Sequence, residues 1–193
     1  MIKVKNLHKG FSGVEILKGI STTFEAGKTN LIIGQSGSGK TVFLKSLIGL
    51  HTPEKGTIEF DGRINIEMSI DQRRQLRQEI GMVFQGSALF DSQTVEENVM
   101  FPLKMFTKQS DKEMLERANF VLKRVDLVGA NKKYVAELSG GMQKRVAIAR
   151  AIVMQPKYLF CDEPNSGLDP QTAIIIDNLI KEITEEFKIT TVI

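Results

Sequence analysis

A glycine-rich segment with a lysine and a threonine is the first part of this chain whose residues could act on a phosphate. Residues 34–41 read Gly-Gln-Ser-Gly-Ser-Gly-Lys-Thr and fit the phosphate-loop pattern GxxxxGK(S/T). Glycines let the backbone wrap closely around an anion, so that consecutive amides and a positive helix end point at it. Lys40 would hold the β- and γ-phosphates, and the Thr41 hydroxyl would ligate magnesium. The alternative, an ordinary Gly-Ser turn before a helix, leaves the Lys-Thr pair unexplained.

Two consecutive carboxylates could supply the rest of a phosphate-transfer site. Asp162 and Glu163 follow the apolar run Tyr158–Cys161, which places both at the carboxyl end of an expected strand, where ligands of open α/β sheets collect. Asp162 would bind magnesium through water, and Glu163 would polarise a water for in-line attack on a γ-phosphate. A solvated acidic turn ahead of Pro164 is the alternative, which the upstream phosphate loop disfavours.

The turn Leu138-Ser139-Gly140-Gly141-Met142 stands between these two segments, just before the acidic strand. We expect it to open a helix over residues 142–154, with the amides of Ser139, Gly140 and Gly141 exposed at the helix start. No acidic side chain three residues after Ser139 competes for those amides, so they stay available to a phosphate. A plain glycine-rich helix entry is the alternative.

The elements that must position these residues follow from hydrophobic periodicity and turn signals. Strands are predicted at residues 2–7, 16–24 and 57–60, the last entering a hairpin at Asp61-Gly62, which indicates an antiparallel sheet near the N-terminus. A short buried strand at 29–33 leads into the phosphate loop and a helix at about 40–50. Strands at 80–84 and 158–161, and one beginning at Lys188, complete an α/β core.

Between Gln85 and Tyr158 the pattern is helical throughout, which predicts a helical lobe inserted into the core. Thr94 with Glu97, and Ser110 with Glu113, have capping-box spacing at helix starts. A further helix begins at Asp169-Pro170, where proline in the first turn does no harm.

Composition bounds the protein class. The chain has 193 residues, 41% of them hydrophobic, enough for one core or a core with an inserted lobe. A net charge of +3 is too small to indicate a nucleic-acid partner. The only cysteine, Cys161, lies in an apolar run, so a buried thiol and a reducing compartment are expected. No run approaches the roughly 18 apolar residues of a membrane span.

All these segments occur in the order and spacing of the nucleotide-binding subunit of an ABC transporter, which the chain resembles over nearly its whole length. The resemblance implies an α/β fold: a P-loop NTPase core with an N-terminal antiparallel β-sheet and an inserted α-helical subdomain. Residues 1–193 would form a single ABC-type domain, with 1–85 and 156–193 as the core with its β-subdomain and 86–155 as the helical subdomain.

The resemblance also implies residue roles in an ATPase that uses ATP and Mg²⁺. Phe11 would stack on adenine, and Gln85 would touch magnesium and the lytic water. Asp162 and Glu163 match the Walker B aspartate and the catalytic glutamate, and magnesium would be held by Thr41, Gln85 and Asp162. The ATP-binding residues would be Phe11, Gly34, Gln35, Ser36, Gly37, Ser38, Gly39, Lys40, Thr41 and Val42.

Two further segments resemble the parts of this family that act between subunits. The turn at residues 138–142 resembles the signature sequence, and Ser166-Gly167-Leu168-Asp169 resembles the loop that signals between two ATP sites. In this family two subunits pair head to tail, and ATP on one phosphate loop is completed by the signature of the other. The resemblance therefore implies an ATP-dependent homodimer with a separate transmembrane permease, bound indirectly at the cytoplasmic face of the bacterial inner membrane.

A narrower resemblance, to the ATPase of Mla/Mce-type phospholipid transport systems, rests on residues 81–92 and 94–103 and on Met142 followed by Gln143. In the wider family this stretch lines the groove that receives a cytoplasmic helix of the membrane partner. An apolar loop with Leu89 and Phe90 partly exposed would suit such docking. Packing within the helical lobe is the alternative.

Several positions depart from the commonest family pattern. Phe11 replaces tyrosine and keeps the stacking ring, whereas Met142 replaces glutamine and loses an amide. Asn165 stands where threonine is frequent, and Gly167 where alanine is common.

A larger departure concerns the switch histidine, which the family places just after the strand that begins at Lys188. The chain ends at Ile193 before that position, and His8 and His51 lie in other segments. We therefore expect either a domain that is incomplete at its C-terminal end or impaired hydrolysis.

The expected reaction is ATP and water to ADP and phosphate, coupled to transport. The alternatives are an ABC ATPase of another importer or exporter, for an amino acid or a lipoprotein, and a nucleotide-binding fragment without turnover. Family members that act on nucleic acid carry a long coiled coil between phosphate loop and signature, or two ATPase units in one chain. This chain has neither feature, and its weak net charge also argues against them.

Overall fold

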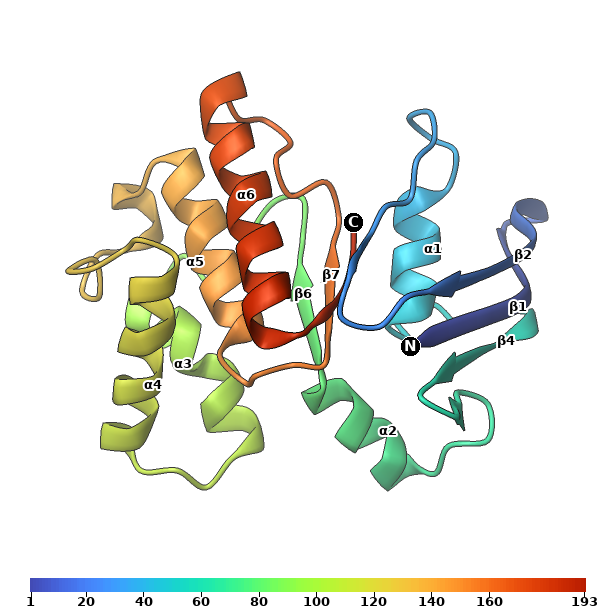
Figure 1. Ribbon diagram of the computed structural model, residues 1–193, viewed down its shortest axis with the longest axis horizontal. Helices are drawn as coiled ribbons and strands as arrows, with labels where there is room; N and C mark the ends of the chain where they lie inside the picture. Colours follow the sequence, from blue (N-terminus) through green and yellow to red (C-terminus); the bar gives the residue numbers. More distant parts are fainter.

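The computed structural model describes residues 1–193 and contains two four-stranded sheets with helices packed on them (Figure 1). The antiparallel sheet has the order β2-β1-β4-β5, and the parallel sheet the order β3-β8-β7-β6. The strands are β1 (Ile2–Phe11), β2 (Val14–Phe24), β3 (Thr29–Asn30), β4 (Lys55–Phe60), β5 (Arg63–Ile64), β6 (Ile80–Val83), β7 (Tyr158–Cys161) and β8 (Thr190–Val192).

Six α-helices pack with the two sheets. They are α1 (Lys40–Leu47), α2 (Ile70–Gln78), α3 (Val95–Phe106), α4 (Asp111–Arg124), α5 (Gly140–Ile152) and α6 (Pro170–Phe187), with a short 3₁₀ helix at Val135–Glu137. In Figure 1, α3, α4 and α5 gather at one end, whereas α1 and the antiparallel sheet form the other, with α6, β6 and β7 between them. None of the helices is both long enough and apolar enough to cross a bilayer.

Strand β7 lies between two hydrophobic cores and contributes side chains to both. Successive strand residues face opposite sides of a sheet. Leu159 and Cys161 therefore pack into a core built mainly by α3, α4, α5 and α6. Tyr158 and Phe160 instead join a core that α1 forms with the antiparallel strands. The whole strand is buried, as expected for a central parallel strand covered on both faces.

The register of the parallel strands brings their carboxyl ends level. Val83 of β6 pairs with Cys161 of β7, so Gln85 and the Asp162-Glu163 pair leave the sheet at the same edge. The site residues predicted on these two segments are thereby brought together.

Local capping chemistry sets three helix starts as predicted. The capping boxes of Thr94 with Glu97 and of Ser110 with Glu113 are both formed. Asp169 accepts hydrogen bonds from the Gln171 and Thr172 amides, with a proline in the first turn of α6. Cys161 is buried as predicted, and burial raises the pKa of its thiol to about 12.

The strand predicted at residues 29–33 is shorter than expected, and its burial was predicted wrongly. Asn30 and Ile32 face the core side, but Leu31 and Ile33 are 65% and 90% exposed. They point to the opposite face because strand side chains alternate. The backbone pairing runs slightly past β3, since the Ile32 amide bonds the Ile193 carbonyl at 2.7 Å.

Two helices also differ from expectation. Helix α1 ends at Leu47 rather than near residue 50, because Gly49 adopts a left-handed φ of 79°. Helix α2 was not predicted. It buries only Leu76, so its sequence has almost no apolar periodicity, and the start is set by a capping box between Ser69 and Gln72.

Candidate functional site

The phosphate loop lies between β3 and α1 with residues 34–38 exposed to solvent. Gly39 is the N-cap of α1 and has φ 99°, outside the range that residues with side chains favour. A Cβ at this position would also lie 2.8 Å from Cγ2 of Ile16. Glycine therefore lets the loop enter the helix while resting on the antiparallel sheet.

The Lys40 side chain folds back and hydrogen-bonds its own phosphate loop. Its ammonium donates to the carbonyls of Gly34 at 3.0 Å and Gln35 at 3.2 Å, and lies 3.9 Å from Oε1 of Glu163. The Lys40 and Glu163 side chains are 23% and 44% exposed, and such ion pairs contribute about 0–1 kcal/mol. A phosphate could therefore displace these contacts at low cost.

Thr41 and Asp162, far apart in sequence, meet beside the loop. The Thr41 hydroxyl donates to Oδ1 of Asp162 at 2.9 Å, and the Asp162 amide bonds the Val83 carbonyl. Both side chains offer hard oxygen donors, which suit Mg²⁺. The chain has no cluster of three or more His, Cys, Asp or Glu that could bind a metal by itself. These two residues fit a Mg²⁺ whose remaining ligands come from substrate phosphates and water.

Gln85 connects the acidic strand end to the next loop. Its Nε2 donates to Oε2 of Glu163 and to Oγ of Ser166, both at 3.2 Å. Glu163 has a left-handed φ of 46°, a backbone conformation that residues other than glycine adopt only when their surroundings enforce it. The carboxylates of Asp162 and Glu163 thus reach different partners, Thr41 for the first and Gln85 for the second.

The signature turn begins helix α5 two residues earlier than predicted. Ser139 is the N-cap, and its hydroxyl accepts from the Met142 amide at 3.3 Å, so Gly140 and Gly141 lie inside the helix. Gly141 is buried against α6: a Cβ there would lie 2.6 Å from Cγ2 of Thr172. The expectation of three exposed amides is therefore wrong for Gly141, because α6 covers it.

A cavity of about 280 Å³ separates the signature turn from the loop before α6. Ser139, Gly140 and Gly141 line one side, and Gly167, Leu168 and Asp169 another. The two segments predicted to act between subunits are therefore neighbours. No hydrogen bond or ion pair joins the signature turn to the phosphate loop of the same chain, and Figure 1 has α5 and α1 on opposite sides of α6 and β7.

Phe11 stands at the end of β1 with 42% of its surface exposed. The Lys9 ammonium lies 5.0 Å from the ring centroid, and the His51 ring meets it edge-on at 5.1 Å. No local sequence pattern predicts these two neighbours, which hold the aromatic ring at the rim of the antiparallel sheet.

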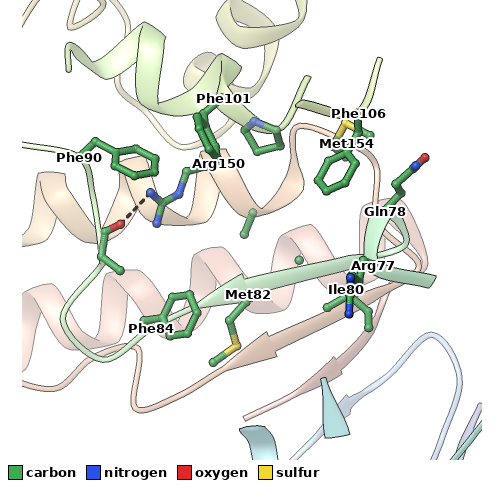
Figure 2. Close-up of a pocket in the computed structure, with 14 residues that line it drawn as sticks. Arg77, Gln78, Ile80, Met82, Phe84, Phe90, Phe101, Phe106, Arg150 and Met154 are labelled. Atoms are coloured by element: carbon green, nitrogen blue, oxygen red, sulfur yellow. Dashed lines mark hydrogen bonds between the residues drawn. The ribbon is translucent and has the colours of Figure 1, made fainter. Parts of the chain in front are cut away.

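An apolar groove of about 300 Å³ opens between β6, α3 and α5 (Figure 2). Nine of its fourteen lining residues are hydrophobic, so it is chemically unlike the phosphate site. Phe90 is 39% exposed, as expected, and its ring packs 4.7 Å from that of Phe101. Other lining residues include Ile80, Met82, Phe84, Pro102, Phe106 and Met154.

Three contacts near the site were not predicted. Lys144 is buried and donates to the Gln85 carbonyl, and Arg150 donates to the carbonyls of Ser87 and Ala88. The available signal was position: Lys144 shares a helical face with buried residues at 141, 148 and 151. Asn165, a departure from the family pattern, donates to both carboxylate oxygens of Asp177 on α6.

Comparison with known proteins identifies the domain. The family model described as ABC transporter matches residues 17–166. This chain belongs to the ABC transporter family. The match confirms the predicted fold class and the expected family of the domain.

Relatives and solved structures agree with this ABC assignment. The chain is 41% identical over 192 residues to the probable ribonucleotide transport ATP-binding protein mkl of Mycobacterium leprae (strain TN), covering 100% of this chain and 55% of that protein. It is 40% identical over 193 residues to the methionine import ATP-binding protein MetN of Clostridium tetani (strain Massachusetts / E88), covering 100% of this chain and 60% of that protein. The chain thus spans little more than half the length of these relatives.

The dimeric structure of MJ0796, a bacterial ABC transporter cassette, superposes on this chain with a TM-score of 0.90 at 34% identity, covering 100% of this chain and 86% of that one. A dimeric post-hydrolysis state of the same cassette, bound to ADP and Pi, gives a TM-score of 0.87 at 33% identity, with the same coverage.

The Thr41 hydroxyl is expected to account for most of the effect of Mg²⁺ on nucleotide affinity. Thr41→Val removes that oxygen at nearly constant volume and should reduce the gain in ATP affinity on adding Mg²⁺ by roughly tenfold, the scale of one charge-assisted contact. Titration of a fluorescent ATP analogue with and without Mg²⁺ measures it. Thr41→Ser, which keeps the hydroxyl, is the control, and an unchanged Mg²⁺ effect in Thr41→Val would refute the assignment.

Proposed function

We propose that this chain is the ATP-binding and ATP-hydrolysing part of a bacterial ABC transporter, acting at the cytoplasmic face of the inner membrane through a separate permease. The observation that carries the proposal is the convergence of Thr41, Gln85, Asp162 and Glu163 beside an exposed phosphate loop. These residues come from three separate segments of the chain, and each has a distinct use in phosphoryl transfer.

Binding of ATP would use the loop amides, Lys40 and Phe11. Lys40 would leave the carbonyls of Gly34 and Gln35 for the β- and γ-phosphates, and the ring of Phe11 would stack on adenine. Thr41 and Asp162 would hold Mg²⁺, which neutralises developing phosphate charge. Residues 34–42 form the rest of the proposed nucleotide contact.

Hydrolysis would be directed by Glu163 and Gln85. Glu163 would accept a proton from water while the water oxygen attacks the γ-phosphorus, and the bond from that phosphorus to the β–γ bridging oxygen breaks to give ADP and phosphate. The contact of Glu163 with Lys40 and Gln85 supports this role, since it holds the carboxylate at the loop. Gln85 would orient the water and touch the magnesium.

We further propose that the signature acts in trans within a head-to-tail homodimer. The Ser139 hydroxyl and the Gly140 amide would contact the γ-phosphate held by a second copy, and the loop at residues 166–169 would report between the two sites. Within one chain, α5 and α1 lie on opposite sides of α6 and β7 (Figure 1), so the signature does not reach its own phosphate loop, which supports a second copy. The dimeric cassettes that the chain resembles support it as well.

The permease would dock in the apolar groove beside β6. Its lining by Phe90, Phe101 and Met154 favours an amphipathic helix that inserts apolar side chains. Figure 2 displays these side chains around one hollow. The groove is bordered by the loop from Gln85 to Phe90, so an occupant would contact the segment that carries Gln85.

The cargo we propose is a phospholipid. Support comes from the resemblance of residues 81–103, and of Met142 with Gln143, to the Mla/Mce-type ATPase. Methionine is the second candidate, favoured by 40% identity to a protein named a methionine import ATP-binding protein. A ribonucleotide is favoured in the same way by the mkl relative.

Replacing Glu163 by Gln should trap the ATP-bound dimer. The substitution keeps size and hydrogen bonding but removes the base, so turnover in the complete protein should fall by roughly 100-fold or more. Size-exclusion chromatography with Mg²⁺ and ATP should yield a stable dimer, and with ADP a monomer. Unchanged turnover would rule out Glu163 as the base.

Cargo is tested by isolating the complete complex from membranes and identifying what it carries. Mass spectrometry should find co-purified phospholipid, and the purified complex should hydrolyse ATP faster in phospholipid vesicles than in detergent with methionine added. Stimulation by methionine, or a bound nucleoside, would instead support the alternatives and overturn the lipid assignment.

A further inference from the structure

Two cations of α5 hold the loop that follows β6. Lys144 donates to the Gln85 carbonyl, and Arg150 donates to the carbonyls of Ser87 at 2.9 Å and Ala88 at 2.8 Å. Figure 2 draws the second of the Arg150 bonds, beside the Phe90 and Phe101 rings. The helix that begins at the signature therefore donates hydrogen bonds to three carbonyls within residues 85–88 of this loop.

The loop backbone depends on such support. Ser87 and Ala88 have φ values of 61° and 50°, which place both in the left-handed region. Non-glycine residues reach that region at an energetic cost and remain there only when neighbouring contacts hold them. The bonds from α5 are contacts of this kind, because they fix the carbonyls of these same residues.

Packing alone does not explain Lys144. The residue is only 5% exposed and has no carboxylate within ion-pair distance, and burial lowers the pKa of its ammonium. Its neighbours on the same helical face, Gly141, Ile148 and Ala151, are buried and apolar. An apolar residue would fill the same space without desolvating a charge, so the bond to Gln85 is the feature that a lysine adds.

The bonded carbonyl belongs to the residue whose side chain enters the phosphate site. Gln85 Nε2 reaches Glu163 and Ser166, while its backbone is held by Lys144, which lies in the second turn of the signature helix. A shift of α5 would therefore be transmitted to Gln85 through one part-buried hydrogen bond. Arg150 secures the loop further along but does not contact Gln85 itself.

We infer that Lys144 is a positioning residue: its bond to the Gln85 carbonyl ties Gln85 to the signature helix and holds the Gln85 side chain at Glu163. The inference rests on the proposed function, because it assigns a role within that ATPase site. ATP binding rests mainly on the phosphate loop, which this bond does not touch. Lys144 accordingly affects turnover far more than nucleotide affinity.

The test compares Lys144→Met, which keeps the stem and removes the charge, with Lys144→Arg, which keeps a buried donor. In the complete protein, Lys144→Met should lower kcat for ATP roughly tenfold with KM changed less than about twofold, and Lys144→Arg should recover most of kcat. Lys181→Met, an exposed lysine on α6, is the matched control. Wild-type kcat in Lys144→Met, or a parallel loss of affinity and folding stability, would overturn the inference.

A second measurement needs no turnover. Hydrogen exchange of the nucleotide-free chain should become faster at amides 86–90 in Lys144→Met, with amides of α3 unchanged. Lack of hydrolysis by the complete wild-type protein would overturn the proposed function. Unchanged exchange over residues 86–90 would overturn the tie between Lys144 and Gln85, so the two failures are distinguishable.

Discussion

The hydrogen bond between Thr41 and Asp162 depends on the whole architecture of this domain. One partner lies in the first turn of α1, the other directly follows β7, and they are 121 positions apart in the sequence. Their 2.9 Å contact requires that β3 and β7 lie in one parallel sheet with β8 between them, and that α1 packs against the same sheet. The site is therefore a property of the sheet's carboxyl edge, where parallel strands deliver residues from distant segments.

Strand β7 makes this edge rigid while connecting it to both halves of the molecule. Its side chains alternate between two hydrophobic cores, so a movement of either core would displace Asp162 and Glu163. The strained backbone of Glu163 fits this position, because strain at a functional residue is sustained by well-packed surroundings. Gln85 and Ser166 then join the strand end to the groove on one side and to the signature region on the other.

The residues that converge were predictable from the sequence because a glycine-rich loop with lysine, and carboxylates at a strand end, have recognisable chemistry. Lys40, Thr41, Asp162 and Glu163 were found in this way, and capping boxes located the starts of α3 and α4. The burial of Leu31 and Ile33 was mispredicted, since apolar composition does not indicate which face of a strand is covered.

Tertiary contacts without a local pattern were beyond prediction. Helix α2 has too few apolar residues to register as periodic. The start of α5 was misplaced because glycines have low helix propensity, yet Ser139 caps the helix and α6 covers Gly141. The bond from Lys144 joins a helix to a loop whose carbonyl gives no sign in the sequence.

The central claim is that each nucleotide site is completed by a second copy of the chain, and a mixing experiment tests it most directly. Lys40→Ala disables the phosphate loop of the chain that carries it. Gly140→Asp disables the signature, because its carboxylate would repel the γ-phosphate. The backbone tolerates this change, since a Cβ at residue 140 would lie 3.6 Å from Leu168, an ordinary contact distance. In a Glu163→Gln background, each variant alone should stay monomeric with ATP. Their mixture should form dimers holding one ATP, because one phosphate loop and the opposite signature remain intact. A mixture as monomeric as its components, or ATP-driven dimers of the Gly140→Asp variant alone, would contradict the account.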